Sequence, residues 1–367
     1  MATNNTQSNI PTLSVGKTVD TLSDIYIKVI NAGIPVKTVP SVMMWGAPGV
    51  GKSQGVRQIA EKIEKGTGKS VHVTDVRLLL FNPIDLRGIP TANEDKTLAV
   101  WLKPQIFKMD ESAEVINILF LDEISAAPQS VQAAAYQITL DRVIGEHKLP
   151  ENCIVIAAGN RITDKSVAYK MPRALANRLM HFEICADFDS WMKWAVKRGI
   201  SSKVTGFLSF RRDLFLNETR ADDLAYATPR SWEMVSNLIL VAGDDVSSVY
   251  HAICGLVGIG TAIEFKSYCD VYRRLPSLDD IFSGRCNDIP KTADVLYALV
   301  SSMTEYARKC KDNLTKIASS IDYAFKMPPD FSAVLMKNYM YLEDGYKLKL
   351  MKIPAFAKWL SKAGKYL

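Results

Sequence analysis

The feature that most constrains this chain is a glycine-rich octapeptide in its first sixty residues. It reads Gly46-Ala47-Pro48-Gly49-Val50-Gly51-Lys52-Ser53 and fits the pattern G-x-x-x-x-G-K-[ST] at every fixed position. An apolar stretch precedes it and a helical pattern follows, so its backbone N–H groups are expected to point into a concave anion site at a helix N-terminus. The pattern predicts a bound nucleoside triphosphate, with Lys52 at the β- and γ-phosphates and Ser53 as a ligand of Mg²⁺.

A second signal is a buried strand that ends in two carboxylates. Residues 115–121 form a nearly continuous apolar run, which is typical of a parallel strand covered on both faces. Asp122 and Glu123 follow it directly. Ligands of open α/β sheets bind outside the carboxyl ends of the strands, where the phosphate loop also lies. We therefore expect Asp122 to hold Mg²⁺ and Glu123 to polarise the attacking water.

A third signal is the asparagine that follows the apolar strand predicted at 153–158. Asn160 comes after Gly159, and Gly-Asn is also ordinary turn chemistry. Its place in the order of strands favours the functional interpretation, in which the side-chain amide of Asn160 orients water beside the γ-phosphate.

The periodicity predicts an α/β fold of the P-loop NTPase type, with a parallel five-stranded sheet flanked by helices. A helical rhythm over 13–30 is expected to lie against this nucleotide-binding domain. The predicted strands are 41–45, 71–76, 115–121, 153–158 and 180–185, the predicted helices 54–65, 130–140 and 173–179, and the predicted hairpin insertions 85–103 and 141–150.

From Phe188 onward no strand is convincing and helical periods dominate. This change predicts an all-helical lid followed by a helical C-terminal extension. The predicted helices include 204–210, 231–241, 249–265, 292–310, 314–325 and 354–363, with a linker over 276–290. The predicted domains are an N-terminal segment 1–37, the nucleotide-binding domain 38–187, the lid 188–285 and the extension 286–367.

Composition limits the classes of function. With 367 residues, 48% of them hydrophobic, the chain is long enough for two or three domains. The 45 basic and 39 acidic residues leave a formal charge of +6, and no run of five or six basic residues occurs. A solvated surface is therefore favoured over a nucleic-acid-binding face.

The six cysteines show no C-x-x-C spacing, and several, such as Cys153 and Cys185, sit in apolar segments. They are interpreted as reduced core residues of a cytoplasmic protein. No stretch of eighteen apolar residues and no signal-peptide pattern occurs, so no membrane association is expected.

Five motifs in this order resemble an AAA+ ATPase of the MoxR-like group, in the helix-2-insert branch and of the dynein-related (AAA_5) type. The resemblance covers about residues 38–245. Its assignment to this subgroup rests on the insert at 85–103 and the hairpin at 141–150. The motifs are GAPGVGKS, ILFLDE (118–123), AAGN (157–160), LANR (175–178) and TPRSWE (228–233).

The resemblance implies roles for individual residues. Asn160 matches the first sensor of the family, and Arg230, at the start of the lid helix after Thr228-Pro229, matches the second. Arg178 matches the arginine finger that such proteins present to the ATP site of the next subunit, with the nearby Arg173 as its rival. A guanidinium there stabilises charge on the transferring phosphoryl group and increases the rate by roughly 10³ to 10⁵ in other NTPases.

The resemblance also implies a function. The expected activity is Mg²⁺-dependent hydrolysis of ATP by a ring-shaped homo-oligomer, a hexamer, that remodels or helps to assemble a partner protein. The implied client carries a von Willebrand factor A type domain. The helices after residue 244 show no catalytic constellation, and methionines such as Met336 and Met340 are expected in their core.

Two other functions stay open at this point. The insert-bearing branch also contains nucleic-acid motors, whose hairpins grip the strand, and the basic residues near the hairpin at 141–150 are Arg142, His147 and Lys148. The other alternative is a scaffold whose interactions are gated by bound ATP with little turnover. The carboxylate of Glu123 argues against the scaffold, because a protein without turnover has no need of it.

Overall fold

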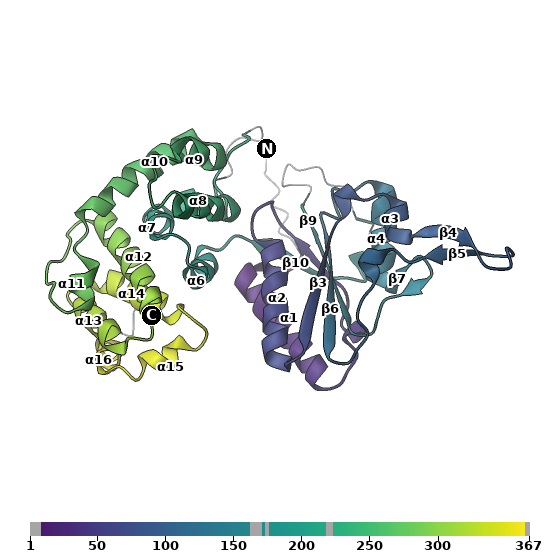
Figure 1. Cartoon of the computed structure of the whole chain (residues 1–367), viewed down its shortest axis with the longest axis horizontal. Helices are drawn as coiled ribbons and strands as arrows, with labels where there is room; N and C mark the ends of the chain where they lie inside the picture. Colours follow the sequence, from purple (N-terminus) through teal and green to yellow (C-terminus); the bar gives the residue numbers. More distant parts are fainter. Residues whose placement is uncertain (1–8, 162–170, 173–175, 218–222, 364–367) are drawn as a thin grey trace. The chain divides into compact units, whose positions relative to one another are not determined.

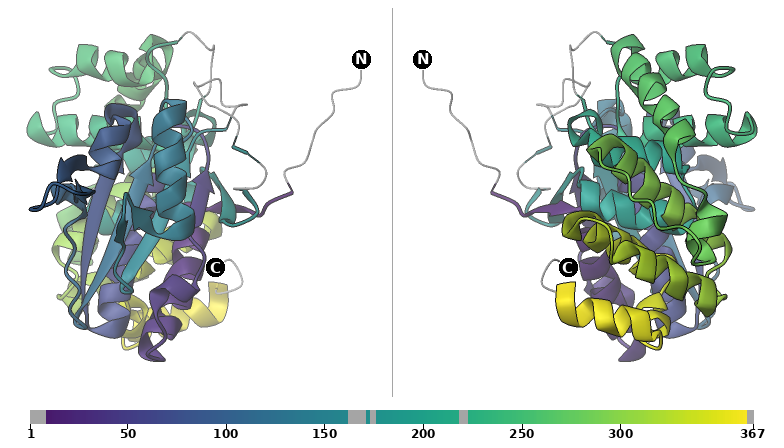
Figure 2. Two further views of the ribbon diagram at one scale, coloured as in Figure 1. Left: turned by 90° about the vertical axis from the view of Figure 1, so that its right-hand side faces the viewer. Right: turned by 90° about the vertical axis from the view of Figure 1, so that its left-hand side faces the viewer.

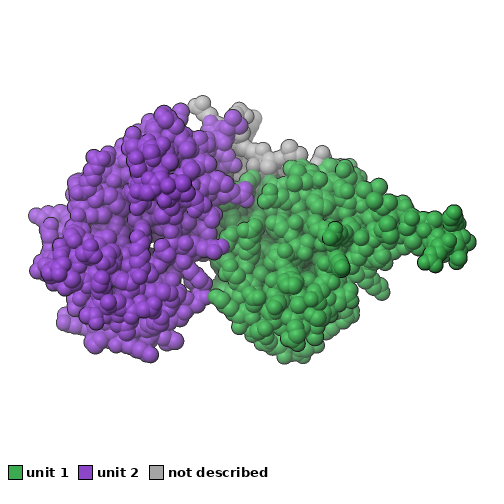
Figure 3. Space-filling view, in the orientation of Figure 1, with its two compact units in different colours: residues 1–186 green, residues 187–367 purple. Residues whose placement is uncertain are grey.

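The computed structural model describes residues 9–161, 171–172, 176–217 and 223–363. The chain divides into two compact units, Met1–Ala186 and Asp187–Leu367 (Figure 3). The first unit is an α/β domain and the second is all-helical (Figure 1). The finer division into four domains stays a prediction.

The first unit is built on a six-stranded parallel sheet in the order β1-β10-β2-β9-β6-β3. Its strands are β1 (Thr12–Ser14), β2 (Val42–Trp45), β3 (Ser70–Arg77), β6 (Val115–Asp122), β9 (Cys153–Gly159) and β10 (Met180–Cys185). Two antiparallel hairpins stand apart from it, β4 (Ile89–Ala92) with β5 (Ala99–Leu102), and β7 (Val143–Ile144) with β8 (His147–Lys148).

The predicted five strands are all present, but the sheet has a sixth, β1, so the predicted strand number is wrong. With three residues, β1 is too short to show the alternation that identifies a strand. It is held by pairing, with Thr12 opposite Glu183 on β10, and by a hydrogen bond from the Glu183 amide to the Pro11 carbonyl at 2.9 Å.

Helices cover both faces of the sheet. They are α1 (Val15–Asn31), α2 (Lys52–Thr67), α3 (Pro83–Arg87) and α4 (Gln129–Asp141). Along β6, Ile118 and Phe120 pack with the α1 and α2 side, whereas Leu119 and Leu121 pack with the α4 side. The continuous apolar run of this strand is thus explained, because successive side chains enter two different cores.

The predicted N-terminal helix is confirmed as α1, which packs along α2 (Figure 1). The close approach depends on a glycine in α2. A Cβ atom at Gly66 would lie 2.6 Å from Cδ1 of Ile27. The N-terminal segment is therefore an integral layer of the first unit.

The described residues of the second unit form helices and no strands (Figure 2). Eleven of these helices are α-helices. They are α6 (Phe188–Arg198), α7 (Ser202–Phe210), α8 (Pro229–Val241), α9 (Tyr250–Val257), α10 (Ile259–Cys269), α11 (Leu278–Phe282), α12 (Ala293–Lys309), α13 (Leu314–Ala324), α14 (Pro329–Met340), α15 (Tyr346–Leu350) and α16 (Pro354–Ala363).

An aromatic cluster forms the core of the α7–α10 part of this unit. The rings of Phe207, Trp232 and Phe265 lie within 5.6 Å of one another, and all three are buried. Gly206 lets α7 approach this core, because a Cβ there would lie 2.7 Å from the Tyr272 hydroxyl. Aromatic pairs at such distances stabilise by about 0.5–1.5 kcal/mol beyond their burial.

Some sequence-based boundaries in the second unit are wrong. The helix predicted over 249–265 is two helices, α9 and α10, which are separated at Gly258 (φ 85°). The predicted linker contains α11, and α14 was not predicted. Met336 is buried in α14 as expected, and Met340 is partly buried. No helix in the described ranges is both long and apolar enough to span a lipid bilayer.

All six cysteines lie in the described residues and none forms a disulfide, but their environments differ. Cys153 is completely buried, and burial raises the pKa of its thiol to about 12. Cys185, which was expected in the core, is instead exposed at the end of β10. The final residue of an apolar strand can leave the core, so the prediction for Cys185 is wrong.

These environments predict a difference in reactivity. N-ethylmaleimide at pH 7.5 should modify Cys185 in the folded protein and should leave Cys153 unmodified, because the thiolate is the reactive form. Peptide mass spectrometry before and after denaturation would measure both. Equal labelling of the two thiols in the folded protein would contradict the burial of Cys153.

Candidate active site

The glycine-rich loop connects β2 to α2 and owes its shape to glycines. Gly49 (φ 79°) and Gly51 (φ 104°) adopt left-handed backbone conformations that residues with a Cβ rarely adopt. At Gly46 a Cβ atom would lie 2.5 Å from the Ile184 carbonyl oxygen. The three glycines of the motif therefore each meet a distinct steric requirement.

Lys52 connects the loop to a neighbouring strand. Its side chain is buried, and Nζ donates to the carbonyl oxygens of Gly46 at 2.5 Å and Ala47 at 3.0 Å. Nζ also donates to Oδ1 of Asn160 at 3.1 Å. A buried ammonium needs such acceptors, and phosphate oxygens form stronger, charge-assisted bonds with it. The geometry therefore places a cation where the predicted triphosphate would lie.

Ser53 and Asp122 are brought together from sequence positions 69 residues apart. The Ser53 hydroxyl donates to Oδ2 of Asp122 at 3.0 Å, and the backbone N–H of Glu123 donates to Oδ1 at 2.9 Å. The hydroxyl and the carboxylate lie at the same edge of the sheet.

The charge around Asp122 suits a cation. Burial raises the pKa of the Asp75 carboxyl on β3, and the negative charge of Asp122 raises it further. Mg²⁺ prefers oxygen ligands and is bound in proteins by one or two carboxylates together with substrate phosphates. Ser53 and Asp122 fit this donor set. Within the described ranges no three His, Cys, Asp or Glu side chains gather as a metal cluster of their own.

Glu123 lies in a turn with an unusual backbone. Its φ of 59° is in the left-handed region, and its side chain is half-buried. The next residue ties the turn to β9, because the Ile124 amide donates to the Ala158 carbonyl at 2.9 Å. The turn therefore directs the chain away from the strand directly after the two carboxylates.

Ser125 is a site residue that the sequence analysis missed. Its hydroxyl accepts from the backbone N–H of Asn160 at 2.8 Å, so it joins the turn after β6 to the end of β9. A Cβ atom at Gly159 would lie 2.8 Å from this same hydroxyl oxygen. No sequence motif marks a serine at this position, because its partner is 35 residues away.

The two arginines near β10 are in different situations. Arg161 forms an ion pair with Glu183, a buried residue on β10. Arg178 lies in the turn before β10, and its side chain is exposed without an ion pair to any described residue. Arg161 is thus held within its own subunit, whereas Arg178 faces outward. The rival candidate, Arg173, lies outside the described residues.

Arg230 belongs to the second unit. It is the second residue of α8 and is exposed. The helix begins with a reciprocal cap, in which the Thr228 hydroxyl accepts from the Ser231 amide at 3.0 Å and the Ser231 hydroxyl accepts from the Thr228 amide at 2.8 Å. Its role as a second sensor stays a prediction.

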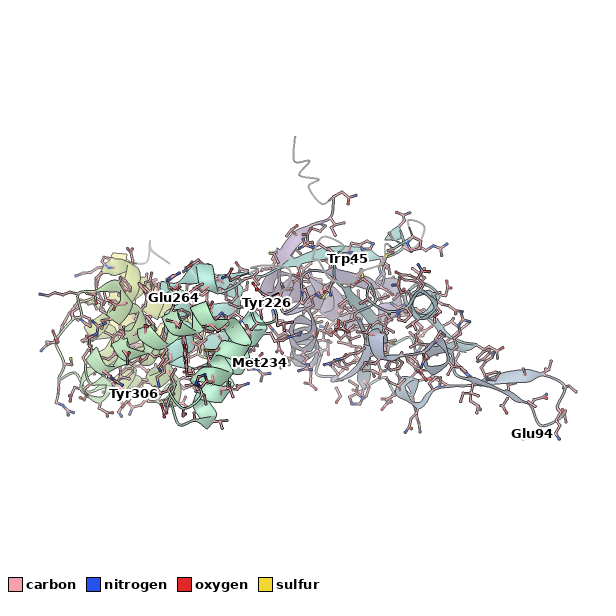
Figure 4. The ribbon with its side chains drawn as sticks, turned by 90° about the horizontal axis from the view of Figure 1, so that it is seen from above. Trp45, Glu94, Tyr226, Met234, Glu264 and Tyr306 are labelled. Carbon is pink, nitrogen blue, oxygen red and sulfur yellow. The ribbon has the colours of Figure 1, made fainter. Side chains whose placement is uncertain are left out.

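A further link that the sequence did not reveal joins the loop region to the turn of Arg178. Trp45, labelled in Figure 4, is the last residue of β2 and directly precedes Gly46. Its indole N–H donates to Nδ1 of His181 on β10 at 2.9 Å, and the two rings stack with centroids 6.1 Å apart. Nε2 of His181 lies 2.7 Å from the Ala176 carbonyl oxygen.

Comparison with known proteins gives a match for the loop-bearing part of the chain. Residues 41–181 match the family model described as "ATPase family associated with various cellular activities (AAA)". This range contains the phosphate loop, both carboxylates, Asn160 and Arg178. No protein among curated sequences matches the chain.

Solved structures give only distant likenesses. A RuvB mutant from Thermotoga maritima is 15% identical, with 80% of this chain and 86% of that chain covered and a TM-score of 0.37. A putative ATPase from Cytophaga hutchinsonii is 14% identical, with 96% and 90% covered and a TM-score of 0.34. NtrX from Brucella abortus with ADP is 13% identical, with 97% and 70% covered and a TM-score of 0.37. TM-scores this low assign neither fold nor function.

The contacts of Lys52 generate the first prediction about the site. Lys52→Ala should weaken ATP binding at least about 30-fold, which corresponds to roughly 2 kcal/mol, because a charged partner of the phosphates is lost. Titration with a fluorescent ATP analogue would measure this. Lys62→Ala, an exposed position on the same helix, is the matched control and should bind as the unmodified protein does. Unchanged affinity of Lys52→Ala would contradict the assignment.

Proposed function

We propose that this protein hydrolyses ATP with Mg²⁺ and couples hydrolysis to the remodelling or assembly of a partner protein, as MoxR-like proteins do, because residues 41–181 match the family model of the AAA ATPases. The proposal includes a ring of identical subunits, hexameric in that group. Its location in the cytoplasm stays a prediction.

One observation carries the proposal. Lys52, Asn160 and Asp122 follow or end three successive strands of the sheet, β2, β9 and β6, and hydrogen bonds from Lys52 and Ser53 reach the ends of the other two strands. Ligands of parallel sheets bind at this edge. A loop that binds phosphate, a carboxylate–hydroxyl pair that suits Mg²⁺ and an amide beside the γ-phosphate position are the components that hydrolysis of a triphosphate requires.

Each residue has a distinct task in this reaction. Lys52 would bind the β- and γ-phosphates, Glu123 would accept a proton from the attacking water, and Asn160 would orient that water. Ser53 and Asp122 would hold Mg²⁺, which supplies neutralising charge at the phosphates when it is bound. The bond between Lys52 and Asn160 fixes the amide relative to the loop before the substrate arrives.

The exposed Arg178 supports completion of the site by a neighbouring subunit. An arginine finger must leave its own domain to reach the γ-phosphate of the next protomer. Arg161, paired with Glu183, does not satisfy this condition, whereas Arg178 does. A site divided between two protomers explains why a ring would be the active form.

The β4–β5 hairpin supports a protein client. Its tip carries Glu94 (Figure 4), and exposed aliphatic side chains lie on its strands and in the turn between them. Exposed fractions reach 58% for Ile89, 68% for Leu98 and 58% for Leu102. Grouped apolar side chains of this kind mark protein contacts. The resemblance suggests a client with a von Willebrand factor A domain.

The proposal predicts the behaviour of a trap variant. Glu123→Gln should bind ATP with unchanged affinity and lose about 10² to 10⁴ of its turnover, because the amide cannot accept the proton. Phosphate release and nucleotide titration would measure the two properties separately. Glu94→Gln, at the hairpin tip, is the control of equal charge change. Full activity of Glu123→Gln would remove the general base from the mechanism.

Sharing of the site predicts a dependence on protein concentration. ATPase activity per subunit should increase as rings assemble, and Arg178→Ala should lose roughly 10³-fold or more while still binding ATP. Activity assays alongside light scattering would follow both. Equal specific activity in dilute monomer and in assembled rings would contradict completion in trans.

A nucleic-acid motor is the second candidate, and one observation favours it. Six of the 45 basic residues and none of the 39 acidic ones lie in 346–367, so the rest of the chain carries 39 of each. The formal excess of +6 therefore equals the charge of this segment. Such a segment attracts anionic partners, including nucleic acid.

The β7–β8 hairpin, however, lends this candidate little support. Arg142 donates to the carbonyl oxygens of Cys153 at 2.6 Å and Val39 at 3.2 Å, so its guanidinium stabilises the fold. Nε2 of His147 lies 2.8 Å from the Trp101 carbonyl oxygen, within hydrogen-bond distance. Of the three basic residues singled out there, only Lys148 is exposed. Stimulation of ATP hydrolysis by DNA, with a steep loss at higher salt, would promote the motor over the remodelling protein.

A further inference from the structure

His181 occupies a position between the phosphate loop and the turn that carries Arg178. On one side it accepts the Trp45 indole N–H, and Trp45 is bonded through the backbone to Gly46. On the other side it contacts the Ala176 carbonyl. Two side chains, the Trp45 indole and the His181 imidazole, thus form a short chain of contacts from the loop to the turn.

The partners of His181 fix its tautomer. An indole nitrogen can only donate and a carbonyl oxygen can only accept. Nδ1 must therefore be the acceptor, and Nε2 must carry the hydrogen that it donates to Ala176. Rotating the ring by 180° would place carbon atoms against both partners. The contacts consequently specify one ring orientation and one neutral form.

The Ala176 carbonyl holds the turn of Arg178 closed. It accepts from Nε2 of His181 and also from the Leu179 amide at 3.2 Å, so Asn177 and Arg178 are the central residues of this turn. Leu179 is buried, whereas Asn177 and Arg178 are exposed. The base of the turn is fixed and its tip, with Arg178, projects outward.

We propose that His181 is a positioning residue that links the state of a subunit's own phosphate loop to the placement of its Arg178. A displacement of Gly46 on nucleotide binding moves the adjacent Trp45, and the stacked, hydrogen-bonded imidazole transmits the movement to the Ala176 carbonyl. This inference rests on the proposed function, in which Arg178 completes the site of the next subunit.

A merely structural histidine would behave differently. Its loss would loosen β2 and β10 and thereby impair the subunit's own nucleotide site, regardless of what its arginine does. A positioning residue acts through Arg178 and therefore impairs the neighbour's site. The two roles are separable when sites and arginines are contributed by different subunits.

The experiment mixes two inactive variants. Glu123→Gln subunits bind ATP, do not turn it over and present Arg178, whereas Arg178→Ala subunits have an intact site but no arginine. Mixed rings should recover ATPase activity wherever an intact site meets an intact arginine. His181→Ala is then added to one partner or to the other, and sizing checks that each mixture assembles.

The expected results are asymmetric. His181→Ala in the Glu123→Gln partner should lower the recovered activity at least about tenfold, since a misplacement of 1 Å costs on the order of 10²-fold. The same change in the Arg178→Ala partner should leave the recovered activity within about twofold. Trp45→Phe, which keeps an aromatic ring and removes the N–H, should act in the same direction.

A conservative variant tests the hydrogen-bond logic. His181→Gln offers an NH₂ donor group and a carbonyl acceptor, so it should restore part of the activity that His181→Ala loses in the Glu123→Gln partner. His181→Phe keeps the stacking and offers neither bond, so it should not restore activity. Thermal unfolding of each variant, and ATP binding by the Arg178→Ala, His181→Ala subunit, measure folding and the nucleotide site directly.

Each failure has a different meaning. If the two inactive variants, both with His181 unchanged, form mixed rings but recover no activity, Arg178 does not act in trans. Both the proposed function of Arg178 and this inference are then wrong. If these two variants recover activity together and His181→Ala has no effect in either of them, the positioning role of His181 is wrong, whereas the role of Arg178 in trans is kept. Equal losses in both partners would also overturn it and identify a structural histidine.

Discussion

The desolvated ammonium of Lys52 is the constraint on which the rest of the site depends. A buried cation is costly unless acceptors surround it, and here they come from two carbonyls of the loop and from Asn160, which directly follows the neighbouring strand β9. These acceptors require a curled loop, which in turn requires left-handed glycines. They also require β2 and β9 to be adjacent, so the charge, the loop and the strand order form one interdependent arrangement.

Much of the α/β unit was predictable, because its signals are local. The phosphate loop and the apolar run of β6 are contiguous in sequence, and each has a physical reason that is independent of distant residues. The three-residue β1 and the break at Gly258 were not predictable in this way. The first has too few residues to show a period, and the second interrupts an apolar pattern that continues on both sides.

The same difference between local and long-range signals applies to the candidate site. Its motif residues were identified from spacing, and the structure brings Lys52, Ser53, Asp122 and Asn160 together, although their roles stay predictions. Ser125 and His181 were missed since they act through partners 35 and 136 residues away, and neither carries a motif. Cys185 shows the converse error, in which an apolar neighbourhood in sequence was interpreted as burial in space.

The contact between Gly159 and Ser125 limits how the sequence can diverge. A side chain at 159 would meet the Ser125 hydroxyl at 2.8 Å, so it becomes acceptable only after that hydroxyl is removed. Removing it deprives the Asn160 amide of its acceptor. Substitutions at positions 125 and 159 are therefore coupled. In evolution both residues would change together or both would stay as they are.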